Sequence, residues 1–199
     1  MELENLVQAV TDSLFVELEA SGRHVHVTRE QAMTLFGHLL TPKRPLSQPG
    51  QFLARERVTL VGEKGEFRDV AVLGPERREG QVEISLTDGR VLGIAPPVRL
   101  SGDVEGTPGI VLLGSNGRVE LTQGVIAAKR HIHLTPRAAA HFGVKNGENV
   151  KLKALTRRPV IFEDVSVRVS ERFAPFAHLD YDEANACGFC KGDLGRILK

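Results

Sequence analysis

The chain has 199 residues, 41% of them hydrophobic and 26% charged, an ordinary composition that suits one large domain or two of about 100 residues. A formal net charge of +1 gives no reason to expect nucleic acid or an acidic membrane as the main partner. No apolar run approaches the roughly 18 residues that span a bilayer and no secretory signal is recognisable, so we expect a cytoplasmic protein without a membrane span.

Residues 1–14 carry the pattern of a short amphipathic helix. Spacings of three and four residues place five apolar side chains on one helical face: Leu3, Leu6, Val7, Val10 and Leu14. This helix either packs on the body of the protein or acts as a detachable segment that docks on a partner.

A longer motif occurs twice along the chain. "RHVHVTREQAMTLFG" begins at Arg23, and "RHIHLTPRAAAHFG" begins at Arg130, one residue shorter between Ala139 and Phe142. Seven randomly placed histidines would give roughly a quarter of one His-x-His pair. Two pairs with matching flanks therefore indicate an internal duplication and a duplicated use for the histidines.

Short strand signals dominate the rest of the chain. Segments rich in Val, Ile and Leu are separated by Gly at intervals typical of small barrels or sandwiches. They are "RVTLVG", "RDVAVLG", "QVEISL", "GIVLLG", "RVELTQG", "NVKLKAL" and "DVSVRVS".

A short helix is predicted after each His pair. Thr28 can cap "REQAMTLF", and Thr135 with Pro136 can open "RAAAHF", while Gly37 and Gly143 end the two helices. The predicted fold is mostly β, with two related small β-barrel domains and short capping helices that arose by duplication. The expected division is an N-terminal segment 1–14, a first barrel 15–125 and a second barrel 126–199, between which strands can be exchanged.

The His pairs suit a metal ion. On a strand, residues i and i+2 point to the same face, so His24 lies beside His26, and His131 beside His133. Neutral imidazoles placed in this way can share one Zn²⁺. A single pair would be better explained as surface histidines, but the repetition favours metal binding.

Each pair needs further ligands, and His178 in "FAHLDYDEANACG" is a candidate. The following acidic residues Asp180, Asp182 and Glu183 can receive a ring proton from a metal-bound histidine, or can simply cap the helix "DEANAC". Cys187 and Cys190 form a lone Cys-x-x-Cys pair, which we interpret as two reduced thiols because no second pair completes a zinc site.

Several segments together resemble the PduL-type phosphate acyltransferases, or phosphotransacylases. Beside the two His motifs these are "LTPKRPLSQPGQF", "LGPERREGQVEIS", "APPVRLSGDVEGTPG" and "HLDYDEANACG", in the family's order from about Phe15 to Leu198. The resemblance implies an enzyme that exchanges CoA and phosphate on short acyl groups such as propanoyl or acetyl. It also implies two β-barrel domains and two zinc ions per chain.

The resemblance also assigns residues to roles. It implies one zinc held by His24, His26 and Glu83, and a second held by His131, His133 and His178. It assigns phosphate to Arg77, with the adjacent Arg78 as the alternative and Ser101 as a further candidate. CoA is assigned to Ala20, Ser21, Gly22, Lys64 and Asn185.

These residue types suit attack of phosphate on an acyl-CoA thioester, which gives acyl phosphate and CoA. Zinc is a Lewis acid for the developing negative charge, and arginine binds phosphate through two parallel hydrogen bonds. Two alternatives stay open: a dizinc hydrolase of phosphoesters or thioesters, and a metal-stabilised scaffold without chemistry.

The resemblance implies a location as well. Family members that work inside bacterial microcompartments carry a short amphipathic leader, which residues 1–14 match as a segment for shell proteins. The sequence is compatible with a free cytoplasmic enzyme or an enclosed one, and with a monomer or a homo-oligomer.

Overall fold

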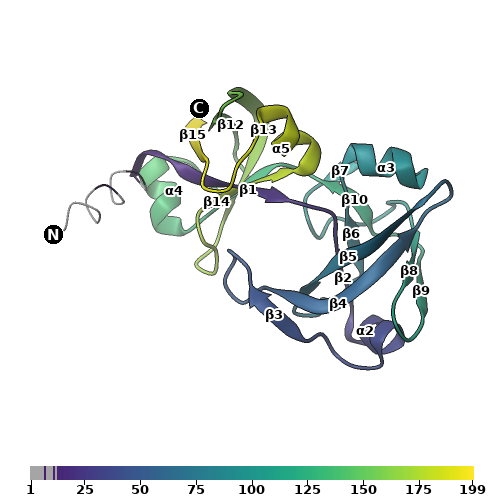
Figure 1. Cartoon of the computed structure of the whole chain (residues 1–199). Coiled ribbons are helices and arrows are strands. Elements are labelled where there is room, and N and C mark those ends of the chain that lie inside the picture. Colours follow the sequence, from purple (N-terminus) through teal and green to yellow (C-terminus); the bar gives the residue numbers. More distant parts are fainter. Residues whose placement is uncertain (1–6, 8–10, 12) are drawn as a thin grey trace. The chain divides into compact units, whose positions relative to one another are not determined.

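The computed structural model describes residues 7, 11 and 13–199, which divide into two compact units. We call residues 22–129 the N-terminal unit, and residues 130–199 together with 1–21 the C-terminal unit. Each unit has its own hydrophobic core. The predicted mostly β architecture is confirmed, because strands make up most of the regular structure in both units (Figure 1).

The C-terminal unit is built around a closed six-stranded barrel (Figure 1). Its interior is filled by side chains such as Leu18, Ile132 and Leu152, all at most 1% exposed. The strands follow one another around the barrel in the order β1 (Val16–Ser21), β14 (Phe176–Asp180), β11 (His131–Leu134), β13 (Val160–Val169), β12 (Asn149–Leu155) and β15 (Leu194–Leu198).

The N-terminal unit is a curled nine-stranded sheet that does not close. Eight strands follow one another in the order β7 (Val98–Arg99), β10 (Val125–Ala128), β6 (Gln81–Glu83), β2 (His24–His26), β5 (Glu66–Gly74), β4 (Phe52–Val61), β8 (Ile110–Leu113) and β9 (Arg118–Leu121). The ninth strand, β3 (Pro42–Pro45), pairs with β4.

The strand before each His motif belongs to the opposite unit. β1 precedes the first motif but pairs with β14 and β15, whereas β10 precedes the second motif but pairs with β6 and β7. The expected boundary at residue 125 assigned β1 to the first barrel, while the compact units divide at Ser21 and Lys129. A strand's apolar pattern specifies its buried face but not its pairing partner, so the sequence allowed for an exchange of strands without showing which strands take part.

Both helices predicted after the His motifs are confirmed. α2 (Arg29–Phe36) is capped by the Thr28 side chain, and α4 (Pro136–Phe142) by that of Thr135. Each helix ends at a glycine with left-handed backbone, Gly37 at φ 78° and Gly143 at φ 64°.

Two further helices follow strands that matter for the site. α5 (Tyr181–Cys187) is the predicted "DEANAC" helix and follows β14. α3 (Leu86–Leu92) follows β6 and was not predicted, because "QVEISL" was interpreted as strand up to Leu86. Ser85 in fact caps α3 through the backbone N–H of Asp88.

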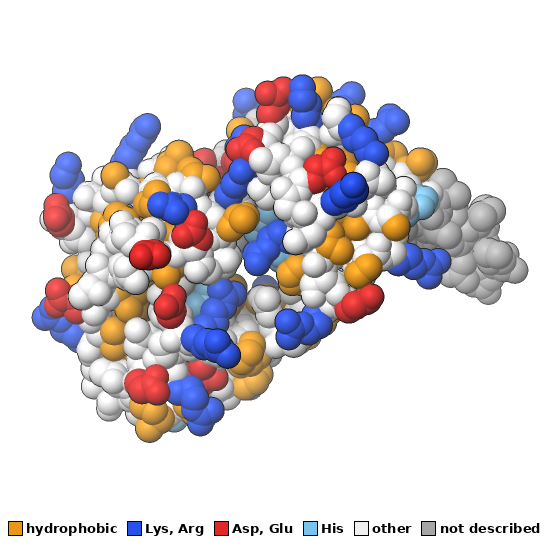
Figure 2. Space-filling view, turned by 180° about the vertical axis from the view of Figure 1, so that it is seen from behind, with side chains coloured by type: hydrophobic (Ala, Val, Ile, Leu, Met, Phe, Trp, Pro, Cys, Tyr) orange, Lys and Arg blue, Asp and Glu red, His pale blue; other side chains and the backbone are white. Residues whose placement is uncertain are grey.

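The predicted N-terminal helix falls largely outside the described residues. Leu3, Leu6 and Val10 of its apolar face are not described, while Val7 and Leu14 are exposed at 57% and 52%. No helix in the described part of the chain is long and apolar enough to cross a membrane. On the face seen in Figure 2, both positive and negative side chains are present, and neither sign covers the whole face.

Candidate active site

The first His pair lies on β2, beside the strand that carries Glu83. β2 and β6 are antiparallel, and His24 is the direct Cα partner of Glu83. Directly opposed residues point to the same face of a sheet, so the three side chains converge. Glu83 is buried, with only 7% of the residue exposed. We call His24, His26 and Glu83 the carboxylate centre.

Hydrogen bonds orient both imidazoles of the carboxylate centre. Nδ1 of His24 donates to the carbonyl of Gly22 at 2.8 Å, and Nδ1 of His26 faces the carbonyl of Leu73 at 3.3 Å. A proton on each Nδ1 leaves both Nε2 atoms with lone pairs, only 3.2 Å apart. Two lone pairs so close repel each other unless a cation or a proton lies between them.

Glu83 supplies the negative charge of this centre. Its oxygens lie 3.5 Å from Nε2 of His24 and 3.9 Å from Nε2 of His26. Burial alone would raise the pKa of Glu83, but the two neighbouring imidazoles outweigh burial and hold it below its usual range. Burial likewise would lower the pKa of His24, and the Glu83 carboxylate raises it instead. The carboxylate is therefore ionised and favours a cation among these three side chains.

Arg77 lies next to the carboxylate centre. Its backbone N–H donates to the carbonyl of Val27, directly after the His pair, and its Nη1 donates to Oγ of Ser101 at 3.1 Å. Burial, the His24 ring and the Arg77 guanidinium together lower the pKa of His26. The adjacent Arg78 is exposed. The structure thus brings together Arg77 and Ser101, the two residues linked to phosphate by the sequence.

Gln81 connects this pair to Glu83 and was missed by the sequence reasoning. Its amide nitrogen donates to Oε1 of Glu83 at 2.5 Å and to Oγ of Ser101 at 2.9 Å. Its oxygen accepts from the backbone N–H of Gly102 at 2.8 Å, and only 2% of the residue is exposed. The spacing Gln-x-Glu on a strand was the available signal, because it places Gln81 on the face of Glu83.

The second His pair lies on β11 of the C-terminal unit. β11 is antiparallel to β14, and His131 is the direct Cα partner of His178. The three rings have centroids 4.7 to 4.9 Å apart. We call His131, His133 and His178 the histidine centre.

His133 is the most informative member of the histidine centre. Both of its ring nitrogens are buried and have no hydrogen-bond partner among the described residues. Burial, the His131 ring and the Arg168 guanidinium lower its pKa to about 3, so the ring is neutral. Phe173 stacks on it with ring centroids 4.0 Å apart. A neutral imidazole held dry and without partners has a free lone pair to offer a metal ion.

Glu19 provides the carboxylate expected beside His178. Its Oε2 lies 3.3 Å from Nδ1 of His178. The acids that follow His178 in the sequence serve the helix instead, since Asp180 and Glu183 form the capping box of α5. A carboxylate on Nδ1 leaves Nε2 for a metal ion, a common arrangement around metal-binding histidines.

Both centres fit zinc in donor chemistry. In each, three ligand atoms lie within 4.8 Å of one another. Neutral imidazole and carboxylate are ordinary zinc ligands, and three protein ligands are typical of catalytic sites that keep a position open. A bound cation would account for the facing Nε2 atoms of His24 and His26, and for one of the two unpartnered ring nitrogens of His133.

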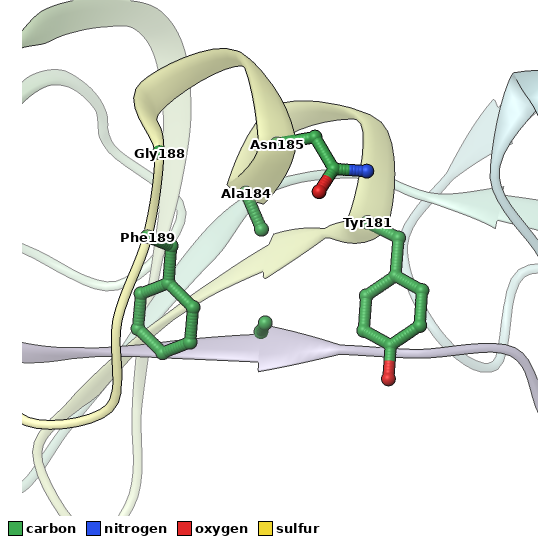
Figure 3. Close-up of a pocket in the computed structure, with 6 residues that line it drawn as sticks. Tyr181, Ala184, Asn185, Gly188 and Phe189 are labelled. Carbon is green, nitrogen blue, oxygen red and sulfur yellow. The ribbon is translucent and has the colours of Figure 1, made fainter. Parts of the chain in front are cut away.

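Two of the residues assigned to CoA meet in a cavity of the C-terminal unit. Ala20, at the end of β1, and Asn185, on α5, line a space of about 370 Å³. Figure 3 shows the rings of Tyr181 and Phe189 on either side of Ala184, with the Asn185 amide above. The two aromatic rings were not predicted from the sequence, although Tyr181 lies in the quoted motif.

The other residues assigned to CoA lie elsewhere. Ser21 ends β1, opposite Asp180 of β14. Gly22 holds His24 through its carbonyl. Lys64 is exposed in the turn after β4, in the N-terminal unit, where its backbone N–H donates to the carbonyl of Leu92.

The fold and the two ligand groups define a mostly β protein with one candidate metal site in each of its two units. The model of the phosphate propanoyltransferase family matches residues 17–190, and the chain belongs to this family. The resemblance noticed in the sequence is thereby confirmed, and the chain is an acyltransferase.

Curated relatives named phosphate propanoyltransferase agree over nearly the whole chain. The protein of Enterococcus faecalis is 55% identical over 185 residues, which cover 92% of this chain and 88% of the relative. That of Clostridioides difficile is 50% identical over 199 residues, covering 99% and 95%. That of Thermotoga maritima is 53% identical over 182 residues, covering 90% and 87%.

Proposed function

We propose that this enzyme transfers a short acyl group between CoA and phosphate, with propanoyl as the main group and acetyl as a second one. The observation that carries the proposal is the pair of three-ligand groups, five of whose six residues are buried, in a chain of this family. Oxygen attack on a thioester needs stabilisation of negative charge more than it needs a nucleophilic side chain.

Two zinc ions would be held by the chain. The carboxylate centre offers His24, His26 and Glu83, and the histidine centre offers His131, His133 and His178. Bound zinc would supply Lewis acidity toward the oxygens and the thiolate that carry developing charge. The residues themselves fix the ligand nitrogens, because the partners of Nδ1 in His24, His26 and His178 leave Nε2 available.

Arg77 is the proposed phosphate-binding residue. Its guanidinium presents parallel N–H donors that match two phosphate oxygens, and the Ser101 hydroxyl holds it in place. The adjacent Arg78 is exposed and makes no such hydrogen bond within the described part of the chain, so it serves as the natural control.

CoA is proposed to contact Ala20, Ser21, Gly22, Lys64 and Asn185. The cavity lined by Ala20 and Asn185 offers two aromatic rings and one amide, a combination that suits a stacked base or an amide-containing chain. Lys64 offers a positive charge for the CoA phosphates.

In the forward reaction a phosphate oxygen forms a bond to the acyl carbon and the carbon–sulfur bond breaks. CoA leaves as the thiolate, which then takes up a proton, so no oxidant or further reactant is needed. Phosphate and acyl-CoA react faster when they are held close together in the correct orientation. This positioning is the main contribution expected from Arg77 and the CoA-binding residues.

The test is to follow CoA release from propanoyl-CoA with and without phosphate, together with direct detection of the acyl phosphate. The proposal predicts CoA release only with phosphate, in equal amount to acyl phosphate. Release of CoA and free propanoate without phosphate would indicate the hydrolase alternative. If the zinc-loaded protein releases no CoA either with or without phosphate, the result would favour a metal-stabilised scaffold without catalytic activity. Acetyl-CoA in the same assay measures the chain-length preference.

We also propose a partner for the N-terminal segment. Residues 1–14 would dock on a shell protein of a bacterial microcompartment through their apolar face, with a free cytoplasmic enzyme as the alternative. The exposure of Val7 and Leu14 supports a surface that a partner can cover.

A further inference from the structure

An arginine precedes each His pair, at Arg23 and Arg130, and neither has a role in the proposed reaction. Arg23 makes a bidentate ion pair with Asp88, from Nε to Oδ2 at 3.0 Å and from Nη2 to Oδ1 at 2.7 Å. Its guanidinium also lies 4.1 Å from the ring centroid of Phe67 on β5. Asp88 is buried, with 7% of its side chain exposed.

Arg130 repeats this arrangement in the other unit. Its Nη1 donates to Oε1 of Glu183 at 2.7 Å, and its Nε donates to the carbonyl of Glu163 at 2.7 Å. Its guanidinium lies 5.9 Å from the ring centroid of Phe162 on β13. β5 and β13 are each the parallel neighbour of a His strand.

The two acids occupy one equivalent position. Asp88 lies five residues after Glu83, and Glu183 lies five residues after His178. Each is the third residue of the helix that follows the third ligand of its centre. Each also forms a capping box with the N-cap residue of that helix, Ser85 for α3 and Asp180 for α5. Each arginine therefore contacts the first turn of the helix that follows the third ligand of its own centre. The two partners of each ion pair are more than 50 residues apart in the sequence.

This contact lies where the backbone ladder ends. β2 and β6 share three paired positions, of which His24 with Glu83 is the last. β11 and β14 also share three, of which His131 with His178 is the last. The backbone pairing between these two strands therefore ends at the ligand pair. Beyond that point the arginine next to the first histidine links the two segments through its ion pair.

We propose that Arg23 and Arg130 are positioning residues for metal binding, each of which holds the first histidine and the third ligand of its own centre at the correct separation. The inference rests on the metal centres of the proposed function. Partners one step away from metal ligands typically change metal affinity by about 10- to 100-fold. Lysine cannot reproduce a bidentate guanidinium contact.

The experiment measures zinc affinity by competition with a chromophoric chelator in Arg23→Lys and Arg130→Lys. Each change is also made in a background where the other centre has lost a histidine, His133→Ala or His26→Ala, so that one centre is read at a time. We expect about 10- to 100-fold weaker binding at the arginine's own centre and no change at the other. Asp88→Asn should weaken the carboxylate centre similarly, and adding it to Arg23→Lys should cause little further loss.

The control is Arg118→Lys, which alters an exposed ion pair with Glu120 in the N-terminal unit. It should leave both affinities unchanged. Thermal unfolding of the zinc-free variants separates positioning from general stability. If the wild type binds two zinc ions and the arginine variants bind zinc with unchanged affinity, the positioning role is overturned while the metal centres stand. This holds even if the zinc-free variants are less stable. A wild-type protein that binds no zinc would overturn both the inference and the proposed metal centres.

Discussion

The carboxylate centre and the histidine centre share one backbone plan and differ in charge. In both, a His-x-His strand runs antiparallel to the strand of the third ligand, and the first histidine faces that ligand directly. In both, a capped helix follows the strand of the third ligand, and an arginine forms an ion pair with the third residue of that helix. The third ligand, however, is Glu83 in one centre and His178 in the other.

This single difference sets the electrostatics of the two centres. Glu83 is ionised and offsets one charge of a divalent cation directly. The histidine centre offers three imidazoles instead, and the Glu19 carboxylate lies behind one of them, at Nδ1 of His178. The histidine centre would leave more positive charge for an anionic ligand. The two centres thus share the strand geometry that brings their ligands together, and the identity of the third ligand makes them unequal in charge.

The largest expected effect comes from removing one ligand of either centre. His26→Ala should remove one zinc equivalent and leave the histidine centre loaded, and His133→Ala should do the reverse. Because each lost zinc takes away Lewis acidity that the proposed reaction uses, each variant should lose more than about 100-fold in phosphate-dependent CoA release. Metal analysis by mass spectrometry and the CoA assay check this. Turnover near wild type in a variant with one zinc would show that the centres are not jointly required.

A comparable loss of turnover, but without loss of metal, is expected from Arg77→Ala, which tests whether phosphate binds beside the carboxylate centre. Losing one preorganised charged donor typically costs about 100- to 1,000-fold in rate. Zinc content and thermal unfolding should be kept, because Arg77 is half-buried and is not a ligand. Arg78→Ala is the matched control and should change kcat/KM by less than about twofold. If Arg78→Ala has the larger effect, the assignment from the sequence is displaced by one residue.

Local signals made much of this fold predictable. Thr28, Thr135 and the glycines that follow specify the ends of α2 and α4 through bonds within a few residues. The His-x-His spacing fixes a shared face on any strand. The helix α3 was missed although Ser85 and Asp88 have capping-box spacing, because Gly89 inside a seven-residue helix weakens the signal.

The partners across the sheets could not be predicted in this way. Arg23 and Asp88 are 65 residues apart in the sequence, and Arg130 and Glu183 are 53 apart. No spacing rule connects such residues, since they meet only after the strands have paired. His178 was one candidate ligand from its sequence context, whereas Glu83 was assigned through the resemblance alone. Their register directly opposite the first histidines gives both assignments a physical basis.

Glu83→Gln tests the charge difference between the centres directly. The change keeps the shape of the side chain but removes the carboxylate, so zinc affinity of the carboxylate centre should fall by more than about tenfold. The histidine centre should be unaffected. His178→Gln is the comparison, and it should weaken the histidine centre while leaving its charge the same. Chelator competition on both variants gives the two affinities, and equal binding by Glu83→Gln and wild type would contradict a role for the charge.

Asn185→Ala should have a milder effect, confined to CoA. Loss of one hydrogen bond corresponds to about 2- to 10-fold in binding, seen as a higher KM for propanoyl-CoA with kcat nearly unchanged. The matched control is Arg90→Ala, because Arg90 occupies the same position on α3 that Asn185 occupies on α5. Equal effects of the two variants on KM would indicate that the cavity beside α5 is not specific for CoA.

The smallest effect on turnover is expected from deleting residues 1–13, which have no counterpart before the second His motif. The duplicated parts carry every proposed ligand, and the deletion ends before β1 begins at Val16. It removes the hydrogen bond between Nε2 of His141 and the carbonyl of Ser13, an exposed contact of small energetic weight. Zinc content and kcat/KM should stay within about twofold of wild type. Self-association, measured by light scattering, or co-localisation with shell proteins should change, because an apolar face is lost. Unfolding or metal loss in the truncated enzyme would show instead that this segment belongs to the core of the C-terminal unit, and would favour the free cytoplasmic enzyme.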